Sequence, residues 1–264
     1  MRAVVRRVLV LGYGAVAYGL FVAAFGYMIC FLAGVVVAKG IDDGAAGPAW
    51  LAVTLDSGLL LLFAVQHSVM ARPWFKRRWT RVVPPAVERS TYVLASTLVL
   101  VLLMAAWRPL PPVVWSVPAG WARIALWALH LAGWVLVLAS TFAIDHVDLF
   151  GLRQVLARAR QRRYEAPAFR TPLLYRLVRN PLMVGFLVVF WAAPHMSVGR
   201  LLFAVASTAY IGAGVRFEER DLSAQLGEPY RRYLNDVPRY LPRLPLRRRS
   251  SGVAGVVNAD LTER

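Results

Sequence analysis

Charged and aromatic residues that suit ligand binding gather in the C-terminal third of the chain. The stretch 179–185 reads Arg-Asn-Pro-Leu-Met-Val-Gly, Glu218–Glu219 follows the next apolar run, and Tyr230 and Tyr233 come after a glycine. An arginine beside a helix N-terminus suits a carboxylate, because the guanidinium and the free backbone N–H groups both favour negative charge. Adjacent carboxylates suit a cationic ligand such as a sulfonium. Two tyrosines three residues apart on a helix share a face and can cover a flat ring such as adenine.

Each of these features also has a purely structural interpretation. The Asn180-Pro181 pair is a good helix start, with asparagine as N-cap and proline at the first helical position. The two glutamates could pair with Arg216 or Arg220, and two tyrosines at this spacing often only pack. Gly227 ends one helix in the manner of a C-cap. Spacing alone leaves these alternatives open.

A histidine near one end of an apolar run is the first candidate for a general base. His67 lies in a Gln-His-Ser-X-X-X-Arg context with Arg72, which would help to orient it, and histidine titrates in the range that acid–base catalysis needs. Ionisable residues within membrane segments are functional candidates by default. His146, between Asp145 and Asp148, is a second candidate, whereas His130 is expected to pack. A lone histidine at a helix end is also often just an interfacial polar residue.

The composition shows what kind of scaffold must position these groups. Of the 264 residues 58% are hydrophobic, yet the net charge is +17. A soluble domain this apolar would expose large patches, whereas long apolar segments separated by arginine clusters indicate an integral membrane protein. We expect no nucleic-acid partner, because the arginines alternate with the apolar segments. Cys30 is the only cysteine, so we expect neither an intramolecular disulfide nor a cysteine-rich metal site, and no metal.

Apolar runs predict six membrane segments. They are Val8–Ala38, Ala49–Met70, Thr91–Trp107, Trp121–Ile144, Pro181–Ala193 and Val198–Val215. Because a bilayer core needs roughly 20 residues per helix, the first segment is long enough to tilt or project, and Pro181–Ala193 is too short to cross untilted. We therefore predict an all-α, polytopic membrane bundle of about five to six helices, with the last two forming a tight hairpin.

Charge predicts the orientation of this bundle. Arginines crowd the N-terminus, the second and fourth loops and the C-terminal region, so the positive-inside rule places both termini in the cytoplasm. Trp50, Trp107, Trp115 and Trp121 are expected in an interfacial belt on the opposite side. We divide the chain into N-terminal membrane helices (1–145), a core with the ligand-binding segment (146–245) and a disordered basic tail (246–264) that contacts anionic lipid.

The same motifs resemble a known superfamily. Arg-X-Pro-X-X-X-Gly, then Glu-Glu, then Gly-X-X-Tyr-X-X-Tyr and Val-Pro is similar to the isoprenylcysteine carboxyl methyltransferases, which are membrane enzymes using S-adenosylmethionine. Residues 66–73 (Gln-His-Ser-Val-Met-Ala-Arg-Pro), 88–94 (Glu-Arg-Ser-Thr-Tyr-Val-Leu) and 145–154 (Asp-His-Val-Asp-Leu-Phe-Gly-Leu-Arg-Gln) most resemble the bacterial methanethiol S-methyltransferases and their NnrU-type relatives. The resemblance spans most of the chain.

The resemblance implies a thiol methyltransferase of the bacterial cytoplasmic membrane, with S-adenosylmethionine as cofactor and methanethiol as the small thiol substrate. It implies no obligate protein partner. Residues 167–171 would form a lid over the cofactor, and His67 and Arg72 would be catalytic. The implied cofactor-binding residues are Arg179, Asn180, Pro181, Met183, Gly185, Glu218, Glu219, Tyr230 and Tyr233.

Asn180 departs from the family pattern, which usually has histidine after the arginine. Asparagine can hydrogen-bond a carboxylate or a ribose but cannot titrate, so activity survives only if the family histidine does not carry a proton. Two alternatives to methanethiol methylation stay open. One is a prenylcysteine carboxylate or another lipid-like acceptor, and the other is a non-enzymatic NnrU-type membrane factor, with haem bound through histidines.

Overall fold

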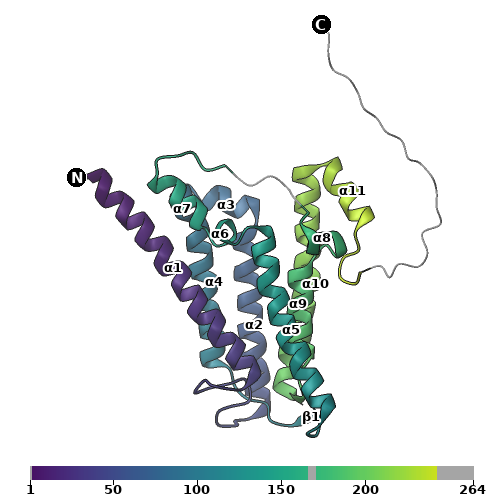
Figure 1. Ribbon diagram of the computed structural model, residues 1–264. Helices are drawn as coiled ribbons and strands as arrows, with labels where there is room; N and C mark the ends of the chain where they lie inside the picture. The colour runs from purple at the N-terminus through teal and green to yellow at the C-terminus, as the bar shows by residue number, and fades with distance from the viewer. Residues whose placement is uncertain (1, 166–170, 243–264) are drawn as a thin grey trace, which may run out of the picture.

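The computed structural model describes residues 2–165 and 171–242, which form a bundle of long helices with short helices at one end (Figure 1). Residues 167–170 of the predicted lid (167–171) and the predicted tail 246–264 lie outside the described residues. The elements in chain order are α1 (Arg2–Ala33), α2 (Ala49–Ala71), α3 (Pro73–Trp79), α4 (Pro85–Ala106), β1 (Val113–Ser116), α5 (Trp121–Ile144), α6 (His146–Leu149), α7 (Leu152–Ala159), α8 (Leu173–Leu177), α9 (Pro181–Trp191), β2 (His195–Ser197), α10 (Val198–Leu226) and α11 (Glu228–Asp236).

The helices confirm the predicted all-α membrane bundle. Within the described residues, five helices are long and apolar enough to cross a membrane, namely α1, α2, α4, α5 and α10. The sixth, α9, is apolar but has only 11 residues, as its short apolar run predicts. It contacts both α10 and α5, so the predicted hairpin partner also packs on an earlier helix.

Contact between α5 and α9 is close because glycines face each other. A Cβ atom on Gly185 would lie 2.8 Å from the carbonyl oxygen of Gly133, and one on Gly133 would lie 2.9 Å from that of Gly185. Small residues let membrane helices approach until their backbones touch. A core cluster that includes Phe31, Trp134 and Phe203 then joins α1, α5 and α10.

Several helix ends differ from the sequence prediction, and α1 begins at Arg2 rather than Val8 and α4 at Pro85 rather than Thr91. The first helix ends at Ala33 rather than Ala38, because Gly34 and Val36 adopt left-handed backbone angles (φ 70° and 69°) that no α-helix continues through. At the other end of the chain, α10 runs past Val215 to Leu226. Glu218 and Glu219 therefore lie on the last turns of a long helix rather than after it, and Gly227 caps that helix as predicted.

The end of the bundle opposite the N-terminus is closed by a small sheet that the sequence did not reveal. Strands β1 and β2 pair antiparallel, with Val113 opposite Ser197, and Figure 1 places β1 at the far end from the N-terminus, α3, α7 and α11. Trp107 was predicted in an interfacial belt but is 1% exposed. It packs against the Phe203 ring, because the chain after α4 turns inward rather than along the membrane surface.

Candidate active site

Arg179 joins the start of α9 to the C-terminal segment. Its guanidinium contacts Glu219 Oε1 at 3.0 Å and donates to the carbonyl oxygens of Val237 (2.9 Å) and Leu234. Its backbone N–H donates to Pro238 O at 2.8 Å. The Val-Pro motif is thus held beside the Arg-Asn-Pro motif, and the Arg179 guanidinium is engaged within the protein.

A second guanidinium, that of Arg239 after α11, also binds Glu219. Arg239 donates to Glu219 Oε2 at 2.5 Å and to Oε1 at 3.2 Å, and Glu219 is 8% exposed. Pairing of this glutamate with Arg216 or Arg220 is therefore wrong, because residues from two other elements face it first. A buried carboxylate that loses a partner is costly, so the cluster of Arg179, Glu219 and Arg239, which we call the arginine clamp, positions the C-terminal segment.

Asn180 has few structural contacts of its own. It occupies the N-cap position of α9, as predicted, but its side chain makes no capping hydrogen bond. Its amide donates to Arg239 O at 3.5 Å, at the limit of a hydrogen bond. Unlike the Arg179 guanidinium, this amide is available to a ligand at the helix start.

Tyr230 and Tyr233 lie together on α11, with ring centroids 5.8 Å apart. Tyr230 is 4% exposed, and Tyr233 donates to the carbonyl oxygen of Tyr175 at 2.7 Å. Burial raises the pKa of each of the two phenols to about 12, so both stay neutral at physiological pH. The predicted common face is present.

Glu218 points to a different set of groups from its neighbour Glu219. Its side chain is accessible but is surrounded by protein, and the cations within electrostatic reach of its carboxylate are Arg72 and Arg89. Arg72, from the end of α2, donates to Asp221 at 2.8 Å, which ties α2 to the last turns of α10. The catalytic candidate Arg72 and the cofactor candidate Glu218 therefore belong to one cluster.

Four tyrosines lie within electrostatic reach of Glu218 and come from different helices, namely Tyr92 on α4, Tyr175 on α8, Tyr210 on α10 and Tyr230 on α11. Anionic and aromatic side chains together suit a sulfonium or ammonium cation. An accessible carboxylate amid these groups can therefore accept a small organic cation.

His67 is enclosed by two of these tyrosines. Its Nε2 lies 2.7 Å from the Tyr92 hydroxyl and its Nδ1 lies 2.8 Å from the Tyr210 hydroxyl. Its ring stacks on Phe63 at 5.4 Å. The first candidate base thus belongs to the same group of side chains as Arg72 and Glu218.

The other candidate base lies elsewhere. His146 bonds Tyr18 of α1 at 2.8 Å and Thr141 at 2.9 Å, and stacks on Phe142. Burial lowers its pKa. These contacts fix the junction of α1, α5 and α6, so His146 has a packing role in this structure.

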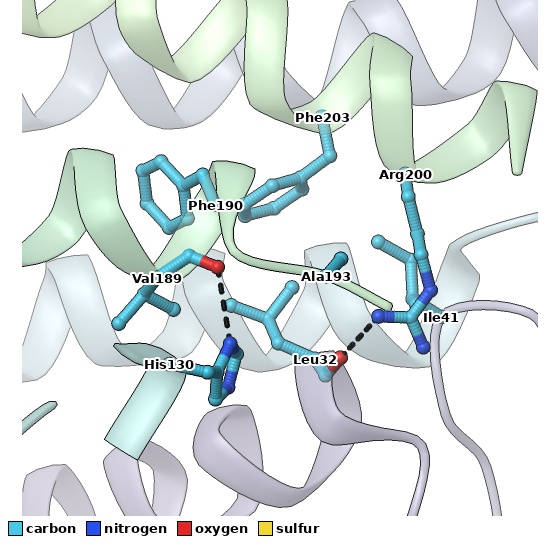
Figure 2. A pocket seen from close by; sticks show the side chains of 8 residues that line it. All are labelled: Leu32, Ile41, His130, Val189, Phe190, Ala193, Arg200 and Phe203. Carbon is cyan, nitrogen blue, oxygen red and sulfur yellow. Dashed lines mark hydrogen bonds between the residues drawn. The ribbon is translucent and has the colours of Figure 1, made fainter. Parts of the chain in front are cut away.

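His130 borders a small cavity at the end of the bundle that carries the sheet (Figure 2). As Figure 2 shows, its Nδ1 lies 3.1 Å from Val189 O, and Arg200 on the other side donates to Leu32 O. Its Nε2 accepts from Trp134. The cavity of about 10 Å³ holds one water at most. His130 is therefore the packing residue that the sequence predicted, and this cavity does not fit a haem.

The remaining candidates on α9 differ in position. Pro181 is buried at the helix start and Met183 is half-buried. Gly185 is covered by α5 through its contact with Gly133, so the role that the structure shows for Gly185 is helix packing. Several neighbours of the site were given no role from the sequence, although they lie in stretches that the family resemblance covers. These neighbours are Tyr92, Tyr175, Tyr210, Asp221 and Arg239.

Known proteins match this chain over most of its length. The model of the family described as NnrU protein matches residues 57–209. A methanethiol S-methyltransferase of Mycobacterium tuberculosis is 52% identical over 239 residues, covering 90% of this chain and 97% of the relative. Methanethiol S-methyltransferase 2 of Bradyrhizobium diazoefficiens is 49% identical, covering 92% and 94%. Human nurim is 35% identical over 176 residues, covering 63% and 66%. No solved structure matches.

Proposed function

The chain belongs to the NnrU family and, within it, to the methanethiol S-methyltransferases, and on this basis we propose that it methylates methanethiol to dimethyl sulfide with S-adenosylmethionine as methyl donor. The observation that carries the proposal is the Glu218 carboxylate, which is accessible yet surrounded by protein and lies among Arg72 and the tyrosines of four helices at the N-terminal end of the bundle. When bound, S-adenosylmethionine supplies an electrophilic methyl group on a positively charged sulfur.

The residues at this end fit such a cofactor. Glu218 would balance the positive charge of the sulfonium. Of the two adjacent glutamates it is the accessible one, because Glu219 is engaged in the arginine clamp. Asn180 at the helix start would hydrogen-bond the carboxylate or the ribose. Tyr230 and Tyr233 would pack against the nucleotide, and Pro181 and Met183 would contact the cofactor from the first turn of α9.

Arg179 and Glu219 act differently from the other cofactor candidates in this proposal. Their side chains bind each other and the C-terminal backbone, so they support the cofactor site by fixing the segment after α11. Gly185 supports it by letting α9 rest on α5.

His67 and Arg72 provide the chemistry on the acceptor side. A thiolate rather than a thiol is the nucleophile, and His67 is a base within the same cluster as Glu218. Arg72 fixes the end of α2, which carries His67, to α10 through Asp221. The enzyme's contribution is to hold donor and acceptor in line in a site with little water.

The test is dimethyl sulfide formation, measured in the headspace above purified protein supplied with S-adenosylmethionine and methanethiol. Glu218→Gln removes the counter-charge with little change of shape, and we expect kcat/KM to fall about 100-fold. Glu228→Gln is the matched control, because Glu228 makes an exposed i,i+4 pair with Arg232 and should retain the original rate.

Two results would overturn the proposal. Protein that binds S-adenosylmethionine but forms no dimethyl sulfide would move the acceptor to a lipid-like carboxylate. Protein that binds no S-adenosylmethionine by calorimetry would exclude the methyltransferase activity itself.

A further inference from the structure

Both ring nitrogens of His67 are occupied by tyrosine hydroxyls, at 2.7 Å from Tyr92 and 2.8 Å from Tyr210. A neutral imidazole has one N–H donor and one acceptor nitrogen, so one tyrosine accepts from the ring and the other donates to it. A thiol meets the ring nitrogens only by displacing a tyrosine. It can approach a tyrosine oxygen without breaking either histidine contact, and in Tyr210 that hydroxyl also lies within hydrogen-bond reach of the Ser68 side chain.

The two tyrosines are not equivalent. Tyr92 is 7% exposed and lies under the Arg89 guanidinium, 5.1 Å from its ring centre. Tyr210 is half-buried and belongs to α10, the helix that also carries Glu218. Tyr210 is therefore the hydroxyl that a small molecule can approach.

The spacing along α10 suits a donor and an acceptor lying end to end. Eight residues separate Tyr210 from Glu218, a rise of about 12 Å. Side chains on a helix lean toward its N-terminus, so both side chains lean the same way and keep about this separation, within electrostatic reach of each other. A sulfonium bound in the space between the two groups can present its methyl group to the Tyr210 hydroxyl.

Resting on the proposed thiol methylation, we propose that Tyr210 is the residue that contacts the acceptor thiol and that it passes the thiol proton to His67. The thiol proton moves to the Tyr210 oxygen while the Tyr210 proton moves to Nδ1 of His67. A bond forms between the thiol sulfur and the methyl carbon. The bond between that carbon and the sulfonium sulfur breaks, and its electron pair returns to the sulfonium sulfur.

This transfer leaves the charge of the site unchanged. One positive charge is lost at the sulfonium and one appears on the His67 imidazolium, while Glu218 is unchanged. The imidazolium then donates one N–H to each tyrosine oxygen, so both of its protons keep partners. His67 returns to the neutral form by releasing its proton to water after the products leave.

The relay also fixes the resting tautomer. Nδ1 must accept from Tyr210, so the imidazole proton must lie on Nε2 and be donated to Tyr92. Tyr92 is then a positioning residue that orients the ring from its buried side. His67 acts as the base without touching the thiol.

The test compares two thiols of different acidity in the variants Tyr210→Phe and His67→Gln. With methanethiol, which is mostly protonated near neutrality, we expect kcat to fall at least 100-fold in both variants, the scale of general-base catalysis. With 2,2,2-trifluoroethanethiol, a more acidic thiol that ionises without help, we expect both variants to stay within about tenfold of the unaltered enzyme.

Tyr18→Phe is the matched control, because it removes another tyrosine–histidine hydrogen bond of 2.8 Å, to His146 on α6. It should leave both rates unchanged. Calorimetric affinity for S-adenosylmethionine should be the same in all three variants, which separates loss of the relay from loss of the fold. An unaltered enzyme that methylates neither thiol speaks against the proposed function rather than against the relay.

Nitrogen-15 NMR of histidine-labelled protein gives a readout that does not depend on turnover. The chain has 4 histidines, and the His67 signal is identified by its loss in His67→Gln. We expect the Nε2–H tautomer in the unaltered protein and a changed Nδ1 shift in Tyr210→Phe. An Nδ1–H tautomer, equal losses on both thiols, or a normal methanethiol rate in Tyr210→Phe would each overturn the proposal.

Discussion

The adjacent residues Arg179 and Asn180 have different duties although they belong to one motif. The guanidinium bonds Glu219 and two backbone carbonyl groups, whereas the Asn180 amide has one contact of 3.5 Å. The first residue therefore builds the site and the second is available to a ligand. The sequence motif contains both residues but does not show which of the two roles each one has.

Asn180→Ala should accordingly weaken cofactor binding without destabilising the protein. We expect the Kd for S-adenosylmethionine to rise about tenfold, which corresponds to about 1.4 kcal/mol, or one hydrogen bond to a charged group. Calorimetry gives the Kd, and thermal unfolding in detergent gives the stability. Arg179→Lys is the contrasting variant, because lysine cannot serve the carboxylate and two carbonyl groups together, and its unfolding temperature should fall. A lowered unfolding temperature for Asn180→Ala would contradict this assignment.

Sequence patterns at this scale give residue types but not pairings. His67 was a candidate base from its context, yet its partners lie 25 and 143 residues away. No local spacing connects Tyr210 to His67, because two helices that never adjoin in sequence bring them together. In the same way, the prediction placed both glutamates in the site, whereas helix geometry directs Glu218 and Glu219 to different neighbours.

At the scale of helices, composition predicts where membrane segments lie but not where they end. The apolar runs located α2, α5 and the short α9 closely, because burial in lipid requires such runs. The end of α1 depends instead on left-handed angles at Gly34 and Val36. The β1–β2 pair forms between segments about eighty residues apart (113–116 and 195–197), and short strands of this kind have no periodic signal to read.

The contact between α5 and α9 can be tested by filling it. Gly133→Ala should force the helices apart, because the new methyl group would lie within 2.9 Å of the Gly185 carbonyl oxygen. We expect a loss of about 1–3 kcal/mol in stability, measured by thermal unfolding, together with weaker cofactor binding at the start of α9.

Gly58→Ala in α2 is the matched control for that substitution. A Cβ atom at Gly58 would meet nothing within 4 Å, and alanine is the better helix former, so stability should stay equal or rise slightly. Equal losses in the two variants would show that close packing of α5 and α9 is not the cause.

For the whole molecule, charge and architecture agree on one polar end. The N-terminus, α3, α7, α8 and α11 lie together at one end of the bundle, and β1 lies at the other (Figure 1). The arginine-rich loops belong to the first end, so on the positive-inside rule we propose that the active site faces the cytoplasm.

This orientation predicts the labelling of single cysteines in intact cells. In a Cys30→Ser background, Ala119→Cys should react with a membrane-impermeant maleimide, because Ala119 is exposed beside the sheet. Arg78→Cys, exposed on α3 at the opposite end, should react only after the cells are permeabilised. The reverse pattern would invert the bundle and remove the proposed cofactor from reach of its cytoplasmic supply.

The arginine clamp has a consequence for how the protein is made. Arg179 precedes α9 in the chain, whereas Arg239 follows α10 and α11. During translation, every membrane helix is synthesised before the second guanidinium of the clamp leaves the ribosome. Until then, Arg179 is the only one of the two clamp arginines that can pair with Glu219. A nascent chain can therefore be fully inserted before the clamp is complete, and on the proposed function we expect its cofactor site to form only when Arg239 reaches Glu219.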